Sequence, residues 1–404
     1  MRSERTAPFL PGILAAILLV AAGCGRAPEP GAVAAVASTH TVLPLRHART
    51  FTVEEGAGYR VVTLRASIVS WGAAAGGQEQ TARLILVPRE ATLPALPPDL
   101  AGAPIIRTPV RRVAVNYTSH EAMLNVLGVA DRLVAVGGTF SYDDAIHARV
   151  KSGELAQVGY GWHSPPVMDA LVAARPEVFL MALGDISHAE SIPRLQALGI
   201  PVVPMFVEAE PTCLGRTEYV RLVGLLTGRE AEAEHFVAEV DSEYARLKAL
   251  AATQPRQRLL WAWPGAGDKW AVTVRNADAH QIHDAHAELL LGESDDLRRD
   301  NFSWLSTEAL LRQGTEADVW VSGDPHSKAY PDERVLRRFK AWREGRVFAV
   351  TGRQKRERDA YEIYEIGILR PDYLLGDIIK ALHPELRPEP FRYLEPVRTV
   401  ASSP

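Results

Sequence analysis

Two stretches of the chain repeat the same order of polar and apolar positions. In the first, Asp169 opens an amphipathic run that leads into the apolar segment 178–183 and ends in a Gly-Asp pair. In the second, Glu308 opens a similar run that leads into the apolar segment 319–322 and ends in another Gly-Asp pair. Each stretch predicts a short helix, a buried strand and a turn. Because the unit occurs twice, it predicts two lobes of like topology with a cleft between them.

Strands and helices alternate around these two units. Ser119 is placed to cap a helix over 121–127, and Gly128 is placed to end it. Such alternation predicts mainly parallel sheets that are covered by helices on both faces. The other predicted strands lie at 113–115, 133–136, 201–206, 258–263 and 347–350, the segment 282–291 continues the second sheet, and further helices lie at 193–198 and 374–382.

Residues 229–252 contain no Gly or Pro, and charged and apolar residues mix there at helical spacing. Such a helix is about 36 Å long at 1.5 Å per residue. A rigid strut between the two lobes explains it well, because the alternation of strand and helix resumes on its far side. A solvated coiled-coil segment is the alternative.

The N-terminal part differs in pattern. Short β-type runs at 51–53, 59–64 and 81–87 are separated by Gly-rich turns and predict a small antiparallel element. A Pro-rich linker from Pro88 to Pro109 follows. Residues 25–40, rich in Ala, Pro and Gly, predict a flexible tether.

The first residues have the features of an export signal. Arg2 and Arg5 precede an apolar run over 7–22, which is short for a membrane span but suits a signal peptide. The run leads into small residues and Cys24, which resembles a bacterial lipoprotein signal with a lipidated cysteine. An ordinary cleaved secretory signal is the alternative. If Cys24 is acylated, Cys213 has no disulfide partner, since the chain has two cysteines.

Composition narrows the class of protein. The chain has 404 residues, of which 47% are hydrophobic and 23% are charged, and this predicts a globular protein of two or three domains. A formal net charge of −4 without a strongly basic domain argues against nucleic acid as a partner.

Aromatic and polar side chains follow the predicted strands, where open α/β sheets bind their ligands. Exposing an aromatic ring forgoes about 1.5–3 kcal/mol of burial. A group of such rings therefore predicts a cleft wall that stacks against a large, partly apolar ligand. The alternative is that several of them fill the base of a sheet. The candidate ligand-binding residues are Tyr117, Ser119, Tyr142, Tyr160, Trp162, His163, Trp263, Trp270, Arg353 and Tyr361, with His120, Phe140 and His326 in the same turns.

Two further segments carry charged or titratable side chains. The stretch 352–358 carries four basic side chains and either attracts an anionic ligand or forms a solvated loop. His280, His283 and His286 do not converge on one ion when they lie on a helix, so we predict no metal site, although two of them could bind one. No HExxH, GxSxG, CxxC pair or phosphate-binding glycine loop occurs, so no catalytic residue is predicted.

These features together resemble the class III substrate-binding proteins of ABC importers, which take up iron–siderophore complexes, haem and cobalamin. The resemblance covers residues 105–386. The loop 352–364 lacks a Gly-Asn-Asp run expected of close relatives, and residues 41–104 lie outside the family pattern. The matching phrases include Arg111-Arg112-Val-Ala-Val, Ala174-Arg-Pro-Glu-Val, Leu226-Thr-Gly-Arg-Glu, Ala317-Asp-Val-Trp-Val and Arg370-Pro-Asp-Tyr-Leu-Leu.

The resemblance implies two three-layer α/β lobes with mainly parallel sheets, joined by one long rigid helix and preceded by a β-rich element. The expected divisions are a signal peptide at 1–24, a tether at 25–40, a β-rich element and linker at 41–104, a first lobe at 105–228, an interlobe helix at 229–253, a second lobe at 254–390 and a tail at 391–404.

The resemblance also implies function. A lipid-anchored monomer in the bacterial cell envelope, facing the periplasm or the outside, would capture a metal complex without a resident cofactor. It would deliver that complex to an ABC permease and its ATPase. Asp169 and Glu308 match the carboxylates that meet permease arginines in this family. The alternatives are a chelatase-like enzyme acting on a tetrapyrrole, with His120, His163 and the 280–286 histidines catalytic, and a surface module that binds proteins.

Overall fold

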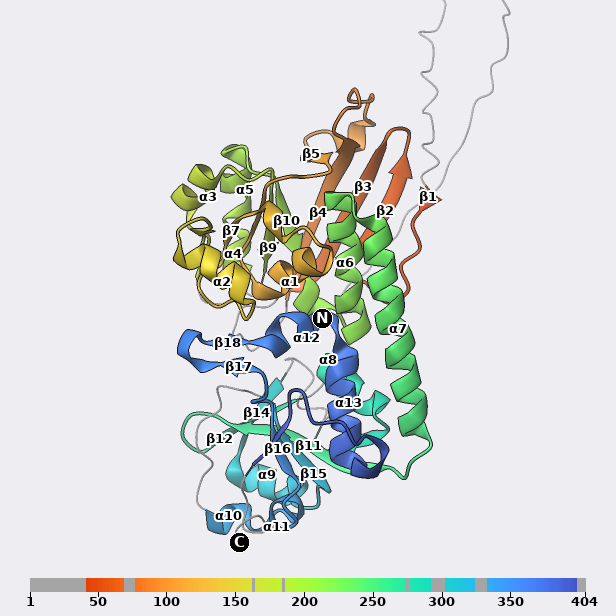
Figure 1. Cartoon of the computed structure of the whole chain (residues 1–404), viewed down its shortest axis with the longest axis vertical. Coiled ribbons are helices and arrows are strands. Elements are labelled where there is room, and N and C mark those ends of the chain that lie inside the picture. Colours follow the sequence, from red (N-terminus) through yellow and green to blue (C-terminus); the bar gives the residue numbers. More distant parts are fainter. Residues whose placement is uncertain are drawn as a thin grey trace, which may run out of the picture. The chain divides into compact units, whose positions relative to one another are not determined.

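The computed structural model of the chain describes residues 41–68, 77–161, 164–183, 186–273, 277–291, 302–323 and 333–397 (Figure 1). The predicted signal with Cys24, the tether and the candidates Trp162, His163 and His326 lie outside these residues. Within them, no helix has the length and apolar character needed to cross a membrane.

The N-terminal element is a five-stranded sheet in the order β1-β2-β3-β4-β5. The predicted antiparallel hairpins are confirmed, and β5 adds to β4 in parallel. The prediction of a linker from Pro88 to Pro109 is therefore wrong for its last residues, because Ile105–Thr108 forms a strand. Its partner β4 lies about 20 residues earlier, so the local sequence pattern does not reveal the pairing. The strands are β1 Thr41–Val42, β2 Phe51–Gly56, β3 Tyr59–Ile68, β4 Gln78–Pro88 and β5 Ile105–Thr108.

Both faces of this sheet are covered. Val62 and Leu64 of β3 belong to the same hydrophobic core as the strands of the first lobe. Val61, on the opposite face, packs with Ile85 and Leu100 in a smaller core. Because consecutive strand residues point to opposite faces, the sheet is an integral part of the first lobe and shares its core.

Two buried carboxylates fix the segment that leads into β2. Glu218 accepts the backbone N–H groups of Arg46, His47 and Ala48 at 2.7–3.0 Å. Glu210 accepts those of Arg49 and Thr50 at 2.9–3.0 Å. Buried N–H groups need such acceptors, so these two side chains anchor the N-terminal sheet to the first lobe.

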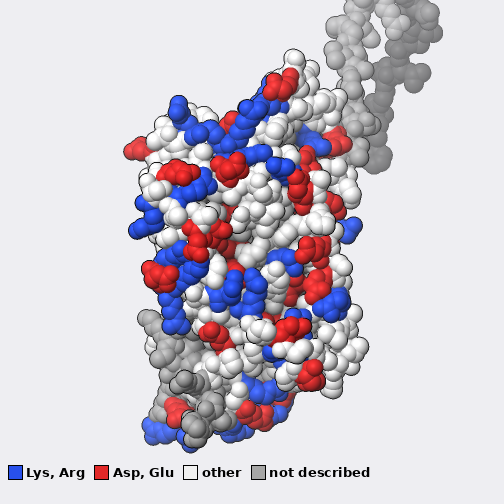
Figure 2. All heavy atoms as spheres, viewed as in Figure 1, with Lys and Arg blue, Asp and Glu red and all other residues white. Residues whose placement is uncertain are grey.

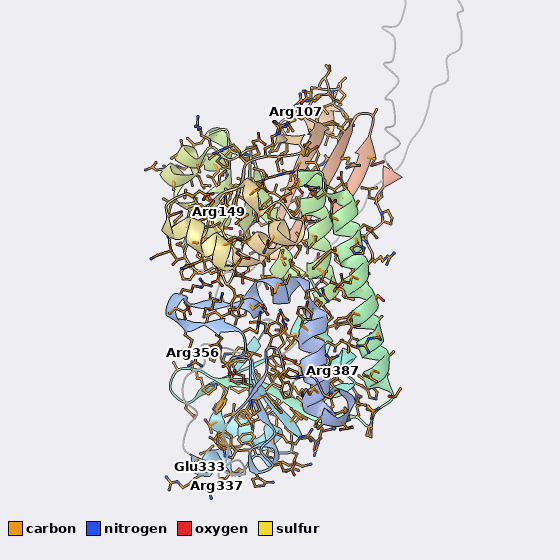
Figure 3. The ribbon with its side chains drawn as sticks, viewed as in Figure 1. Arg107, Arg149, Glu333, Arg337, Arg356 and Arg387 are labelled. Carbon is orange, nitrogen blue, oxygen red and sulfur yellow. The ribbon has the colours of Figure 1, made fainter. Side chains whose placement is uncertain are left out.

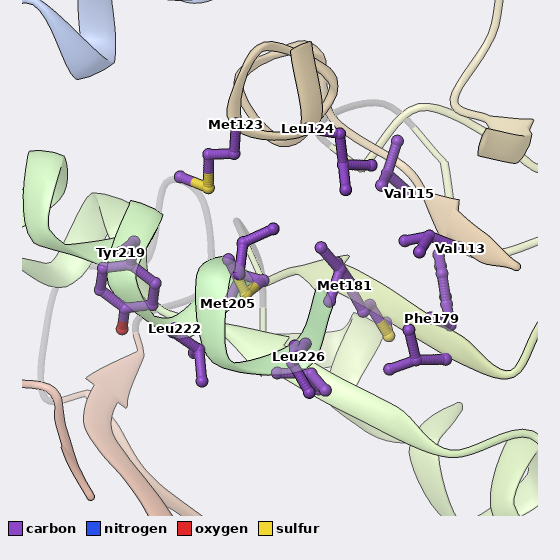
Figure 4. Packing of buried hydrophobic residues seen from close by; sticks show 14 of the residues in the cluster. Val113, Val115, Met123, Leu124, Phe179, Met181, Met205, Tyr219, Leu222 and Leu226 are labelled. Carbon is purple, nitrogen blue, oxygen red and sulfur yellow. The ribbon is translucent and has the colours of Figure 1, made fainter. Parts of the chain in front are cut away.

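The first lobe contains a wholly parallel sheet in the order β10-β9-β6-β7-β8. Its core brings Val113, Met123, Phe179 and Leu226 together from strands and helices (Figure 4). The strands are β6 Val113–Val115, β7 Leu133–Val136, β8 Ala156–Gln157, β9 Val178–Ala182 and β10 Val202–Met205, and the helices are α1 Thr118–Val126, α2 Asp144–Lys151, α3 Met168–Ala174, α4 Ile186–Ala189, α5 Ile192–Ala197 and α6 Cys213–Thr227.

The predicted strut is the 23-residue helix α7, Glu230–Ala252, about 35 Å long at 1.5 Å per residue. It packs along α6 and along α13, Pro371–Leu382, of the second lobe (Figure 1). Gly224 of α6 permits the close approach, since a Cβ there would lie 2.8 Å from that of Ala233. The buried stripe recurs every three or four residues at Ala233, Val237, Val240, Tyr244, Leu247 and Ala251.

The second lobe has a mixed sheet in which β13, β11, β15 and β16 run parallel. At one edge, β12 pairs in antiparallel fashion with β11 and with β14, and at the other edge β19 pairs in antiparallel fashion with β16. The strands are β11 Gln257–Pro264, β12 Lys269–Thr273, β13 Ala287–Leu289, β14 Phe302–Ser306, β15 Val319–Ser322, β16 Val347–Ala349 and β19 Glu395–Pro396, and the helices are α8 Ala277–Asp284, α9 Thr307–Gly314, α10 Glu333–Leu336, α11 Lys340–Arg343, α12 Ile366–Leu369 and α13 Pro371–Leu382.

The predicted fold class is confirmed: two α/β lobes, one strut helix and an N-terminal β-sheet. The repeated unit is present as α3 followed by β9 and as α9 followed by β15. One local prediction is wrong, because α1 begins at Thr118, so Ser119 lies inside its first turn and does not cap it.

Candidate functional site

The two lobes meet at the carboxyl ends of the first lobe's strands. We call this region, which includes Tyr117, Tyr142, Tyr160 and the hairpin 353–361, the seam. A hairpin of the second lobe, β17 Gln354–Lys355 and β18 Ala360–Tyr361, reaches the loop before α2. Lys355 and Arg358 both donate to the Tyr142 carbonyl, at 2.8 and 2.9 Å. Both also pair with Asp144, at 2.8 and 2.6 Å. The hairpin therefore fastens one lobe to the other through charged contacts.

Aromatic side chains predicted as ligand-binding residues meet at the seam. The Tyr160 ring lies 5.3 Å from that of Tyr117 and 4.8 Å from that of Phe140, measured between centroids. Thr118 places its hydroxyl 3.5 Å from the Tyr160 hydroxyl and donates to the Tyr364 carbonyl of the second lobe. Residues from three loops of the first lobe thus form one aromatic cluster against the second lobe.

Other predicted residues lie beside this cluster. The Arg353 guanidinium lies 5.6 Å and the Lys355 ammonium 4.4 Å from the Tyr142 ring centroid. Arg353 is also paired with Glu362 at 2.6 Å. Tyr361 donates to Asp359 and contacts the Tyr364 ring, with centroids 5.9 Å apart.

The structure buries some of the predicted residues, among them Trp270, Ser119 and Tyr117, of which Tyr117 is 6% exposed. Trp270 is 2% exposed and packs against Trp320 in the core of the second lobe, because it is an inward-facing residue of a central strand. Ser119 is fully buried inside α1. Trp263 is half-buried and packs against the second lobe's core. The predictions for Trp270 and Ser119 are corrected accordingly.

Buried carboxyls at the seam were missed by the sequence analysis. Glu121 of α1 and Glu365, just before α12, are 1% and 5% exposed and come from different lobes. Burial, followed by the charge of Glu365, raises the pKa of Glu121 well above its ordinary value. Burial also raises the pKa of Glu365 to about 8, although Tyr142 and Asp143 donate backbone hydrogen bonds to it. Acid residues spaced 244 positions apart give no local signal that the charge of one acts on the other.

Arg216 of α6 is a further residue that the sequence did not single out. Its guanidinium lies 3.3 Å from Glu208 of the first lobe and 3.8 Å from Asp278 of α8. Burial alone disfavours its charge, but the two carboxylates more than offset this, and the pKa of Arg216 is raised. Arg216 therefore bridges acids of both lobes.

The acids of the repeated unit lie at the surface, on helices at opposite sides of the seam (Figure 1). Asp169 is exposed in the first turn of α3. Glu308, in the first turn of α9, has an 81% exposed side chain that pairs with Arg312 at 2.7 Å. Exposed carboxylates at helix N-termini are available to a basic partner.

A pocket of about 470 Å³ lies on the side of α7, away from the aromatic cluster. Tyr244 connects Cys213 and Asp284 on its wall, at 3.3 and 3.1 Å. His280 and Lys248 pair with the same Asp284. Across the described parts of the chain, no group of three or more His, Cys, Asp or Glu side chains is placed to hold a metal.

Charge on the visible face is mixed. Acidic and basic side chains alternate over both lobes and do not gather by sign (Figure 2). Arg356, between the two strands of the hairpin, is exposed, and its Nε donates to Gln354 at 3.1 Å (Figure 3). This face thus offers no broad basic surface of the kind that nucleic acids require.

Comparison with solved structures shows the fold. A periplasmic haem-binding protein from Pseudomonas aeruginosa is similar over 72% of this chain and 99% of its own, with a TM-score of 0.53 and 18% identity. The siderophore-binding protein BauB, bound to acinetobactin and ferric iron, gives a TM-score of 0.52 at 18% identity over 68% of this chain and 94% of its own.

Relatives by sequence and a family model identify the class of protein. Two uncharacterized lipoproteins of Methanocaldococcus jannaschii are 25% and 22% identical, over 70% and 72% of this chain and 67% and 74% of their own lengths. Lipoprotein relatives indicate a location in the cell envelope. The model described as "Periplasmic binding protein" matches residues 113–353, more than half of the chain. The chain therefore belongs to the periplasmic binding protein family, a family of binding proteins and not of enzymes.

Proposed function

We propose that this protein is a lipid-anchored substrate-binding protein that captures a metal complex at the seam and delivers it to an ABC importer. The anchor is the lipidated Cys24, in the envelope of a bacterial cell, and the monomer works with a permease and its ATPase. The ligand is an iron–siderophore, haem or a corrinoid.

One observation carries the proposal: aromatic and charged side chains of both lobes converge at the seam. Tyr160 supplies a ring from the first lobe, 5.3 Å from the buried Tyr117 ring. On the second lobe, Arg353 lies over the Tyr142 ring and Tyr361 contacts Tyr364. A large ligand would stack on such rings once the hairpin contacts open. Trp263 and the residues 162–163 remain candidate contacts; Trp270 and Ser119 do not, because both are buried.

In this proposal, delivery of the ligand to the permease depends on two exposed carboxylates. Asp169 and Glu308 each offer an exposed carboxylate on a different lobe, so a permease with a basic surface can contact both lobes at once. An exposed ion pair contributes about 0.2–1 kcal/mol, which orients docking without trapping the partner.

The test is a titration of purified protein with ferric siderophores, haem and corrinoids, followed by intrinsic fluorescence and calorimetry. Mass analysis of any ligand that co-purifies identifies the natural complex. At least one class is expected to bind with submicromolar affinity, since stacking and charge act together. Absence of binding across all classes would refute the proposed function.

A further inference from the structure

The pocket on the side of α7 has the size of a small-molecule site. Its volume of about 470 Å³ falls within the range of about 300–1,000 Å³ that is typical of ligand pockets. Four segments form its walls: residues 46–47 before β2, the start of α6, the middle of α7 and the end of α8. The pocket therefore borders the first lobe, the strut and the second lobe, and its walls are formed by residues other than those of the seam.

One end of the pocket carries a carboxylate with two basic partners. Asp241 of α7 lies 3.4 Å from Nη1 of Arg46 and 3.2 Å from Nε2 of His47. The Asp241 side chain is 16% exposed, whereas those of Arg46 and His47 are 62% and 30% exposed. The basic groups at this end therefore lie nearer to solvent than the carboxylate that they contact.

The other end repeats this arrangement. Asp284 of α8 lies 2.5 Å from Nζ of Lys248 and 3.3 Å from Nδ1 of His280, and it accepts the Tyr244 hydroxyl at 3.1 Å. Burial disfavours the charge of Asp284, but hydrogen bonds from His280 and Lys248 outweigh burial and lower its pKa. The Asp284 side chain is 10% exposed, against 54% for Lys248 and 48% for His280. Each end thus presents one permanent cation and one histidine in front of a carboxylate.

The permanent cations have donors that a ligand can use. A guanidinium has five N–H donors and an ammonium has three, and the carboxylate contact takes one of them in Arg46 and one in Lys248. An anionic group can therefore bind at either end without displacing Asp241 or Asp284, and it favours the protonated form of the nearby histidine. A cationic group would have to compete with Arg46 or Lys248 for the carboxylates.

An apolar stretch of defined length separates the two ends. Asp241 and Lys248 lie about two helical turns apart on α7, or about 10 Å along its axis, because one turn rises 5.4 Å. Tyr244 and Ala245 lie between them on the helix and line the pocket together with Leu214 of α6. An extended aliphatic chain advances about 1.3 Å per bond for bonds of about 1.5 Å, so a chain of about eight carbons spans this distance.

We infer that this pocket is a second binding site, for a dianion such as a dicarboxylate whose charged ends are joined by an aliphatic chain of about eight carbons. One end binds at Arg46 and His47, and the other binds at Lys248 and His280. Glu218 fastens residues 46–47 to the first lobe, whereas His280 belongs to the second lobe, so the ligand connects the two lobes. The site goes beyond the capture of a metal complex at the seam and does not depend on it.

The experiment titrates the purified protein by calorimetry with suberate, 8-aminooctanoate and 1,8-diaminooctane, which share one chain length and differ in charge, and with the shorter dianion succinate. Suberate is expected to bind at least about tenfold more tightly than each of the others, since only suberate offers an anionic group to both ends. No binding of suberate, tighter binding of the diamine or the amino acid, or equal binding of succinate would each overturn the inference.

Two variants locate the site. Arg46→Gln and Lys248→Gln are each expected to lower the affinity for suberate about tenfold. Arg246→Gln is the matched control, because Arg246 lies on the same helix with a 58% exposed side chain that pairs with Glu243 at 2.7 Å, and it should leave the affinity unchanged. Circular dichroism verifies that all three variants fold. Equal losses in the three variants would show that suberate binds elsewhere and would also overturn the inference, whereas failure of every metal complex to bind would overturn only the proposed function.

Discussion

Replacing Glu218 by Ala tests how the N-terminal sheet is attached. The Glu218 side chain is fully buried and accepts three backbone N–H groups, from Arg46, His47 and Ala48. It also pairs with Arg221 at 2.9 Å. Hydrogen bonds to a charged acceptor contribute about 1.5–3 kcal/mol each, and they are not additive when they share one carboxylate. We therefore expect Glu218→Ala to lower the free energy of unfolding by about 3–5 kcal/mol.

Glu234→Ala is the matched control. Glu234 also pairs with Arg221 at 2.9 Å, but its side chain is 56% exposed and accepts no backbone N–H of residues 46–48. Its loss is expected to cost about 0–1 kcal/mol. The two variants thus separate the buried backbone bonds from the ion pair with Arg221.

Urea unfolding followed by circular dichroism measures both values, and hydrogen exchange locates the change. In Glu218→Ala, exchange at His47 and Ala48 is expected to accelerate more than exchange in the strands of the second lobe. If Glu218→Ala destabilises the protein no more than Glu234→Ala does, the carboxylate does not anchor the sheet and the reasoning is refuted.

Three further predictions follow from the seam and the surface acids. The pKa of Glu365 is raised to about 8 from 4.5, so its contribution to stability is complete below about pH 4.5 and is lost as pH rises through about 8. Over this pH range, the melting temperature of Glu365→Gln should therefore fall less than that of the wild type. Equal falls would contradict the raised pKa of Glu365. Asp144→Asn removes the shared partner of Lys355 and Arg358, so hydrogen exchange in 354–361 should accelerate while the melting temperature changes little; unchanged exchange would show that these ion pairs do not hold the hairpin. Asp169→Lys combined with Glu308→Lys should abolish stimulation of the importer's ATPase and leave ligand affinity unchanged, whereas full stimulation would exclude these acids as docking residues.

The sequence predicted those parts of the fold that local pattern determines. The helix–strand repeat was visible because burial recurs at fixed spacing within about 15 residues. The strut was visible because α7 keeps one apolar stripe over its whole length. Strand β5 was not visible, because its four residues gain stability only from pairing with β4, about 20 residues earlier.

The candidate site was predicted in part for the same reason. Turns after strands β6, β7 and β8 come together in any parallel sheet, so Tyr117, Tyr142 and Tyr160 could be grouped from sequence. Which aromatic side chain points into the core depends on how the strands pair. Trp270 was predicted to line a cleft, but it is buried because β12 lies between β11 and β14 in the sheet. The effect of Glu365 on the pKa of Glu121 depends on how the two lobes meet, which no pattern within either lobe records.

The contacts that join the lobes differ in kind from those that join the N-terminal sheet to the first lobe. The sheet is held by buried carboxylates and a shared apolar core, whose separation would expose unpaired N–H groups and hydrophobic side chains. The hairpin is held by ion pairs to Asp144, whose side chain is 79% exposed, and by hydrogen bonds from Lys355 and Arg358 to the Tyr142 carbonyl. Water can replace the exposed ion pairs at little cost. Since α7 packs against helices of both lobes, we expect any separation at the seam to be confined to small movements about this strut. The N-terminal sheet is therefore joined to the first lobe by buried contacts, whereas the hairpin joins the two lobes through charged contacts that are partly exposed to water.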